Sequence, residues 1–177
     1  MRILMMGTPD FAIPTLDALV SSDYEVVGVI SQQDKPKGRG HHLVPTPLKE
    51  AALSYGLPVY QPKTLKEESF MELLTKLAPD LIVVVAYGKI LPKSVLDFPQ
   101  YGCVNVHASL LPKYRGAGPI QWSIINGETE TGVTTMQMGE GLDTGDILLQ
   151  ERVSITDDVT ADDLFDTLAT LGGKLLI

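Results

Sequence analysis

The sequence of 177 residues contains a single cysteine, Cys103, and no long hydrophobic run. One cysteine cannot form an internal disulfide, so a reducing cytoplasm is the expected compartment, with Cys103 in the core of its strand. No apolar run approaches the ~18 residues that a membrane helix needs, and the longest, around 81–87 (LIVVVAY), predicts a buried strand. The short apolar stretch near the N-terminus runs into Gly7-Thr-Pro-Asp, which is not a signal peptide. We therefore expect no membrane association.

Basic residues are scarce, above all toward the C-terminus. The net charge is -8, and residues 128–177 contain 2 basic and 11 acidic residues. An acidic total argues against a general nucleic-acid binder, although it leaves room for a local basic contact. Residues 34–49 provide such a place, because Lys35, Lys37, Arg39 and Lys49 there outnumber Asp34.

The two common phosphate-binding fingerprints are missing. Gly7-Thr-Pro-Asp-Phe-Ala lacks the G-x-G-x-x-G pattern, and G-x-x-x-x-G-K-[ST] does not occur. A nucleotide cofactor is therefore unsupported. Two adjacent histidines, His41-His42, could contribute to a metal site, but no further ligand lies at a suitable spacing, so we assign no metal.

What is present is the composition of a single globular domain, with 44% hydrophobic and 20% charged residues. Apolar and β-branched runs predict strands at 2–7, 25–31, 58–61, 80–87, 102–108, 131–138 and 146–155. Periodicity and cap residues predict helices at 8–19, 46–56, 66–77, 92–96, 119–125 and 160–177. Alternating strands and helices followed by two late strands indicate a three-layer α/β/α domain with a mostly parallel sheet. Ligands of such sheets bind beyond the carboxyl ends of the strands.

The segment 32–45 is expected to be a loop. It is polar, punctuated by Gly and Pro, basic, and long for a compact domain. Loops of this kind are usually functional or disordered, and a mobile basic loop suits contact with phosphate. A solvated surface loop is the alternative.

The first candidate for chemistry is Asn105-Val106-His107. Alternation along a strand places Asn105 and His107 on one face. An amide donor beside a histidine suits oxyanion stabilisation and acid–base catalysis, whereas the plainer interpretation is that both side chains satisfy loop backbone groups. The sequence Ser109-Leu-Leu-Pro-Lys-Tyr-Arg-Gly116 follows and leads into a helix, whose free N–H groups could meet a carbonyl or anionic oxygen.

The second candidate is Asp143 in Gly141-Leu-Asp-Thr-Gly-Asp146. Its carboxylate is a candidate partner for His107, and the flanking glycines permit a sharp turn or a close approach to a ligand. An Asp that caps a turn is the alternative. An aspartic protease is excluded, because Asp-Thr-Gly occurs in one copy without a second matching carboxylate.

Taken together, residues 105–148 resemble the folate-dependent formyltransferases. The resemblance lies in Asn-x-His, then Ser-Leu-Leu-Pro-x-x-Arg-Gly, and later an Asp in a G-x-D-x-G turn. Within that family, 6–12 (MGTPDFA) and 32–49 are similar to the members that act on initiator methionyl-tRNA. The resemblance implies a Rossmann-like formyltransferase fold, 10-formyltetrahydrofolate as donor, and the methionyl-tRNA amino group as acceptor in translation initiation.

The same resemblance implies roles for individual residues. The catalytic residues would be Asn105, His107 and Asp143. The folate pocket would be lined by Ser109, Leu110, Leu111, Pro112, Ala86, Tyr87, Gly88 and Ile90. The tRNA contacts would come from Lys35, Lys37 and Arg39. A monomer is expected.

The members that act on initiator methionyl-tRNA carry a second, C-terminal β-barrel domain, and this chain is expected to stop before it. Residues 1–177 are therefore expected to be the catalytic domain alone, and the uncapped apolar end at Leu175-Leu-Ile177 is consistent with a piece of a longer protein. Two alternatives remain: a sister formyltransferase acting on a small amine, such as an amino-sugar nucleotide or glycinamide ribonucleotide, and a domain that hydrolyses 10-formyltetrahydrofolate to formate.

Overall fold

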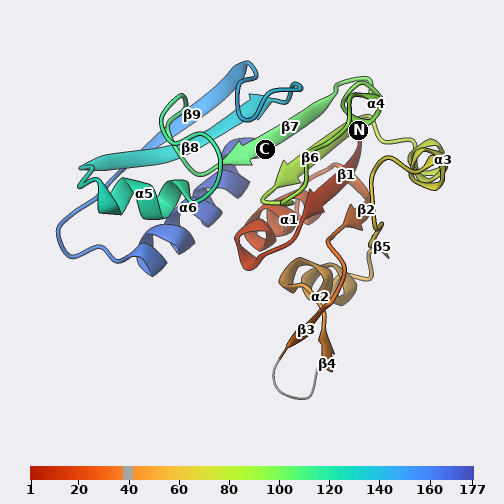
Figure 1. The fold of residues 1–177 in the computed structure, drawn as a ribbon, viewed down its shortest axis with the longest axis horizontal. Coiled ribbons are helices and arrows are strands. Elements are labelled where there is room, and N and C mark those ends of the chain that lie inside the picture. Colours follow the sequence, from red (N-terminus) through yellow and green to blue (C-terminus); the bar gives the residue numbers. More distant parts are fainter. Residues whose placement is uncertain (38–41) are drawn as a thin grey trace.

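A seven-stranded mixed sheet with helices on both faces forms the fold (Figure 1). The structure is a computed structural model that describes residues 1–37 and 42–177. The strands of the sheet are β1 Arg2–Gly7, β2 Glu25–Ile30, β5 Val59–Tyr60, β6 Leu81–Val85, β7 Cys103–His107, β8 Glu130–Gln137 and β9 Ile147–Ser154. The helices are α1 Ile13–Val20 (after a 3-10 turn, Asp10–Ala12), α2 Pro47–Ser54, α3 Glu68–Leu77, α4 Lys93–Leu96, α5 Pro119–Ile125 and α6 Ala161–Leu176. The expected α/β/α architecture is confirmed.

The order of the strands explains where a ligand can bind. It runs β5-β2-β1-β6-β7-β8-β9; the pairs from β5 to β7 in this order are parallel, and β8 pairs antiparallel with both β7 and β9. The chain leaves β1 toward β2 on one side and later returns to β6 on the other. The carboxyl ends of β1 and β6 therefore flank the point at which the strand order reverses, which is where open α/β sheets bind ligands.

Alternation along β1 builds the two core layers. Ile3 and Met5 pack into one cluster with buried residues of α1, α2 and α6, whereas Leu4 and Met6 pack into the other with residues of α3 and α4. Both faces of β1 are covered, as its continuous apolar sequence predicts.

Two expected helix starts are confirmed by their hydrogen bonds. The Thr46 hydroxyl accepts a bond from the backbone N–H of Lys49 at 3.3 Å, with Pro47 at the first helical position. Thr160 and Asp163 form a reciprocal capping box at the start of α6. Such caps satisfy backbone N–H groups that lack partners within the helix.

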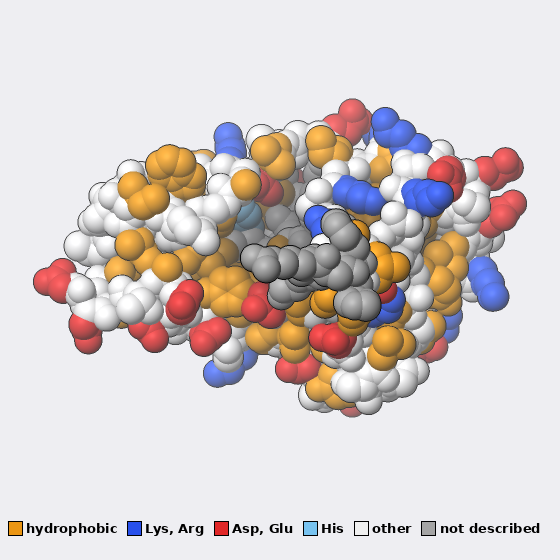
Figure 2. Space-filling view, turned by 60° about the horizontal axis from the view of Figure 1, so that its bottom comes forward, with side chains coloured by type: hydrophobic (Ala, Val, Ile, Leu, Met, Phe, Trp, Pro, Cys, Tyr) orange, Lys and Arg blue, Asp and Glu red, His pale blue; other side chains and the backbone are white. Residues whose placement is uncertain are grey.

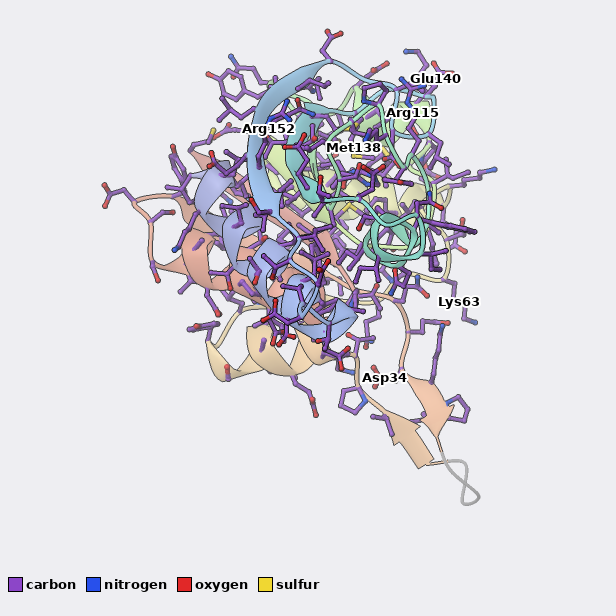
Figure 3. All side chains as sticks on the ribbon, turned by 90° about the vertical axis from the view of Figure 1, so that its left-hand side faces the viewer. Asp34, Lys63, Arg115, Met138, Glu140 and Arg152 are labelled. Atoms are coloured by element: carbon purple, nitrogen blue, oxygen red, sulfur yellow. The ribbon has the colours of Figure 1, made fainter. Side chains whose placement is uncertain are left out.

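The segment 32–45 differs from the expected loop. It contains a two-stranded antiparallel ribbon, β3 Lys35–Lys37 paired with β4 His42–Val44. The alternating apolar signal of a strand is weak in such short, basic segments, so the pairing is not visible in the sequence. The ribbon projects away from the body, and Asp34 lies where it joins the rest of the chain (Figure 3).

Candidate active site

Strand β7 presents Asn105 and His107 to the same side of the sheet. Val106 packs into the core cluster of α1 and α6, and Cys103 packs into the cluster of α3 and α4. Side chains alternate along a strand, so Asn105 and His107 face the side of Cys103. The structure confirms that Cys103 is a core residue, and burial raises the pKa of its thiol to about 12.

The connection between β8 and β9 brings Asp143 close to Asn105 and His107. Because β8 runs antiparallel to β7, Gln137 at its end pairs with Val104, at the start of β7 rather than near His107. The connection to β9 then folds back and brings the Asp143 carboxylate beside both side chains. Gly145 permits this, since a Cβ there would lie 1.7 Å from the carbonyl oxygen of Gln137. The close approach is to protein backbone.

The three side chains lie in contact. The Asn105 amide donates to Asp143 Oδ1 at 3.3 Å, and His107 Nδ1 lies 3.7 Å from Asp143 Oδ2. Only 8% of the His107 and 12% of the Asp143 side chain is exposed. The Asp143 Oδ2 atom also accepts a 2.7 Å bond from the Gly116 backbone N–H. The carboxylate is thus oriented by groups from one strand, β7, and from the loop that contains Gly116.

The orientation of His107 follows from its other nitrogen. Nε2 lies 2.9 Å from the backbone carbonyl oxygen of Tyr114. A carbonyl oxygen only accepts hydrogen bonds, so Nε2 carries a proton and Nδ1 faces Asp143. A proton taken up on Nδ1 would be shared with the carboxylate, which is the arrangement of an acid–base pair.

The loop that follows β7 is held by buried and half-buried hydrogen bonds. The Ser109 hydroxyl donates to the carbonyl oxygen of Lys113 at 2.6 Å. The Thr134 hydroxyl, on β8, donates to the Ser109 carbonyl at 2.7 Å and accepts from Leu111 N at 3.1 Å. Gln150 on β9 donates to this hydroxyl and to the Leu111 carbonyl. Thr134 and Gln150 carry no motif and are missed by sequence reasoning, because their role depends on the antiparallel pairing.

Replacing Thr134 by valine is expected to lower the free energy of unfolding by about 1–3 kcal/mol. Valine keeps the shape but leaves the buried Leu111 N–H and the Ser109 carbonyl without their partner. Chemical denaturation of both proteins measures the difference. Thr129→Val, at a threonine outside this cluster, is the control; equal stability of Thr134→Val and the parent would contradict the role assigned to the hydroxyl.

The other residues of the 109–112 segment differ in exposure. Leu111 is buried, Leu110 is half-buried and Pro112 is exposed. Gly132 on β8 leaves room for Leu110, since a Cβ there would lie 2.6 Å from Leu110 Cδ2. Leu110 and Pro112 are thus the members of the segment with side-chain surface available to a ligand.

The segment 86–90 follows β6, next to the end of β7. Val84 pairs with Asn105, so Ala86 lies two residues beyond this pair on its strand, as His107 does on β7. Ala86 and Gly88 have positive φ, +47° and +81°, and are exposed. Ile90 is 83% exposed.

The side chain of Tyr87 is buried in the core cluster that includes residues of α3 and α4. Burial raises the pKa of its hydroxyl to about 12. Its carbonyl oxygen accepts bonds from Thr8 Oγ1 at 3.0 Å and from Gln32 Nε2 at 2.7 Å. Of the residues predicted to line the folate pocket in this turn, Ala86, Gly88 and Ile90 are therefore exposed, whereas Tyr87 is buried.

A polar cluster anchors the base of the β3–β4 ribbon. Lys49 Nζ donates to Asp34 Oδ2 at 2.7 Å and to Gln61 Oε1 at 2.8 Å, and Gln61 Nε2 donates to Asp34 Oδ1. These bonds, first that from Gln61, hold the pKa of Asp34 below its usual value. Lys35 lies on β3 and is exposed. Arg39 and His41 lie outside the described residues, as do the side chains of Lys37 and His42.

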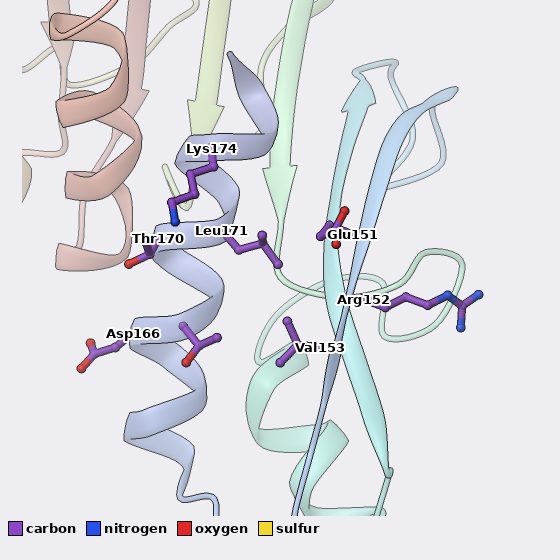
Figure 4. A pocket seen from close by; sticks show the side chains of 8 residues that line it. Glu151, Arg152, Val153, Asp166, Thr170, Leu171 and Lys174 are labelled. Atoms are coloured by element: carbon purple, nitrogen blue, oxygen red, sulfur yellow. The ribbon is translucent and has the colours of Figure 1, made fainter.

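A groove of about 450 Å³ lies on another part of the molecule, between β9 and α6 (Figure 4). Glu151, Arg152 and Val153 line it from the strand, and Asp166, Leu171 and Lys174 from the helix. Its residues belong to none of the predicted sets. Within the described ranges, no group of three or more His, Cys, Asp and Glu side chains could hold a metal ion, and no helix is both long and apolar enough to cross a bilayer.

Comparison with known proteins shows which family this chain is similar to. The sequence matches the Formyl transferase family over residues 1–177. It is 56% identical over 177 residues to the methionyl-tRNA formyltransferase of Pelotomaculum thermopropionicum, and 57% over 176 residues to that of Alkaliphilus oremlandii. These alignments cover 100% and 99% of this chain but 56% and 57% of the relatives, so the chain spans little more than half their length.

The fold is also found among solved structures. The phosphoribosylglycinamide formyltransferase of Bacillus halodurans superposes with a TM-score of 0.80 at 26% identity, covering 99% of this chain and 91% of that one. The family match spans both the strand that carries Asn105 and His107 and the turn that carries Asp143. The chain belongs to the formyl transferase family.

Proposed function

We propose that residues 1–177 form the catalytic domain of a cytoplasmic, monomeric enzyme that formylates initiator methionyl-tRNA from 10-formyltetrahydrofolate. The contact between Asn105, His107 and Asp143 carries the proposal, since it joins an amide donor, an imidazole and a carboxylate. Identity of 56% to a methionyl-tRNA formyltransferase over the whole chain supports this acceptor over a small amine. We also propose that the whole protein contains a C-terminal β-barrel domain, as do the family members that act on methionyl-tRNA.

The chemistry requires the three residue types. The amine nitrogen attacks the formyl carbon, which places negative charge on the formyl oxygen; the bond to the folate nitrogen then breaks. The amine loses one proton and the folate nitrogen gains one. Asn105 would donate to the charged oxygen, a protonated His107 would stabilise that charge, and Asp143, directly or through water, would take the amine proton.

The donor would bind where the turns after β6 and β7 meet. Backbone groups of 86–88 are available there because Ala86 and Gly88 are exposed, and the exposed Ile90 and half-buried Leu110 provide apolar surface. A flat heterocycle needs such a combination of backbone partners and apolar contact. The buried Ser109, Leu111 and Tyr87 would shape this site from beneath, while Pro112 would contact the ligand.

The acceptor would meet the β3–β4 ribbon through Lys35, Lys37 and Arg39. We expect Arg39→Ala to raise the KM for methionyl-tRNA about tenfold while leaving the Kd for the folate donor unchanged, because a phosphate contact is lost and the donor site is not touched. Steady-state kinetics and donor titration measure the two effects. Lys63→Ala is the matched control for removing an exposed positive charge. Loss of donor binding with unchanged tRNA kinetics would contradict the assignment.

The proposed function is tested by supplying 10-formyltetrahydrofolate with methionyl-tRNA, with glycinamide ribonucleotide, or without acceptor. Formylation of methionyl-tRNA alone supports the proposal. Transfer to the small amine would establish the sister activity, and release of formate without acceptor would establish a hydrolase.

A further inference from the structure

The carbonyl group that orients His107 belongs to a residue in an unusual conformation. Tyr114 has φ of +54°, in the left-handed region that bulky side chains rarely adopt. This conformation directs its carbonyl oxygen to His107 Nε2, at 2.9 Å. A backbone held in a sparsely populated region persists only when its surroundings constrain it. The contacts of the Tyr114 side chain therefore bear on the position of His107.

Those contacts lead to the segment that follows α5. The Tyr114 hydroxyl donates to Glu128 Oε1 at 2.7 Å and accepts from Asn126 Nδ2 at 3.0 Å. Glu128 is itself attached to α5, because its backbone N–H donates to the Ser123 carbonyl at 3.0 Å. A continuous set of hydrogen bonds thus runs from α5 through Glu128 and Tyr114 to the imidazole.

Glu128 has a second partner, Lys113, whose Nζ lies 2.9 Å from Oε2. The lysine side chain is 59% exposed, and an ion pair with such an exposed partner contributes little to the stability of the protein. The hydrogen bond from Tyr114 is the first cause, and that from Lys113 the second, of the lowered pKa of Glu128. The carboxylate stays charged at neutral pH and accepts strongly from the tyrosine hydroxyl.

We propose that Glu128 and the Tyr114 hydroxyl are positioning residues for His107, holding the Tyr114 carbonyl in place as the acceptor for Nε2. The inference rests on the proposed function for the effect on turnover. Neither side chain needs to touch substrate. The role predicts a loss in kcat, because a misplaced imidazole affects the reacting geometry more than substrate binding.

The kinetic test uses Tyr114→Phe, which removes only the hydroxyl, together with Glu128→Ala and Glu128→Gln in the intact protein. We expect the first two to lower kcat about tenfold with less than about twofold change in KM for either substrate. Glu128→Gln keeps an acceptor and should recover most of the activity. The double variant Tyr114→Phe/Glu128→Ala should be no slower than the worse single variant. Glu130→Ala, at an exposed glutamate paired with Arg152, is the matched control.

A second readout does not depend on catalysis. Selective ¹⁵N-histidine labelling should reveal a His107 Nε2–H proton that is protected from exchange, assigned by its absence in His107→Ala. We expect protection in the parent, Glu130→Ala and Glu128→Gln, and its loss in Tyr114→Phe and Glu128→Ala. Unchanged protection and kcat in Tyr114→Phe would overturn the inference, as would equal losses in Glu130→Ala. A parent protein without formyl transfer would refute the proposed function, while the proton signal would still decide the positioning role.

Discussion

Substitution of His107 or of Asp143 by alanine is expected to lower the rate of formyl transfer by about 10²-fold or more, the usual loss for an oxyanion stabiliser or an acid–base group. His107→Ala removes the imidazole that Asp143 and the Tyr114 carbonyl hold between them. Asp143→Ala leaves His107 Nδ1 and the Gly116 N–H without their common partner. Single-turnover kinetics with saturating donor and acceptor measure the effect on chemistry alone.

Both variants should keep the fold, because Asp143 lies in a loop and His107 at the end of a strand. Thermal unfolding checks this. Asp146→Asn is the matched control, since Asp146 lies in the same turn with its side chain exposed and its backbone carbonyl still available to Gln137. Near-parent rates for His107→Ala or Asp143→Ala, or an equal loss in Asp146→Asn, would refute the proposed mechanism.

The 177-residue chain alone is expected to fold and bind 10-formyltetrahydrofolate, yet to bind methionyl-tRNA at least about tenfold more weakly than the Pelotomaculum relative of full length. All seven strands of the sheet lie within this length, and both core layers are present. Binding of tRNA sums many phosphate contacts. On the face drawn in Figure 2, Lys and Arg side chains are scattered among acidic ones, and residues 128–177 contain 11 acidic residues against 2 basic ones.

Titration of tRNA against both proteins at low and moderate salt provides the measurement. Fewer phosphate contacts should give this chain the shallower dependence of affinity on salt. Donor titration in the same buffers is the control for an intact active site. Equal affinities with equal salt slopes would show that the additional length of the relative contributes nothing to tRNA binding.

The sequence alone predicted the architecture, and it singled out Asn105, His107 and Asp143, which the structure brings into contact. Continuous apolar runs such as 81–85 predict buried strands, because a strand covered on both faces needs apolar side chains throughout. The helix caps at Thr46 and Thr160 could be predicted from the sequence, because each cap depends on a residue only three positions further along the chain. Asn105 and His107 share a face through strand periodicity, which is also local.

Only the tertiary structure decided how those residues meet and what supports them. Asp143 lies 38 residues from Asn105 and reaches it because the turn between two antiparallel strands folds back toward β7. Thr134 and Gln150 hold the 109–111 segment through pairings between strands, and Tyr114 orients His107 with a backbone carbonyl rather than its side chain. Such contacts depend on strand register and on the direction of the backbone in segments that are far apart in the sequence. Every residue has a backbone carbonyl, so the sequence does not indicate which carbonyl will orient a side chain. Composition and spacing therefore could not predict these contacts.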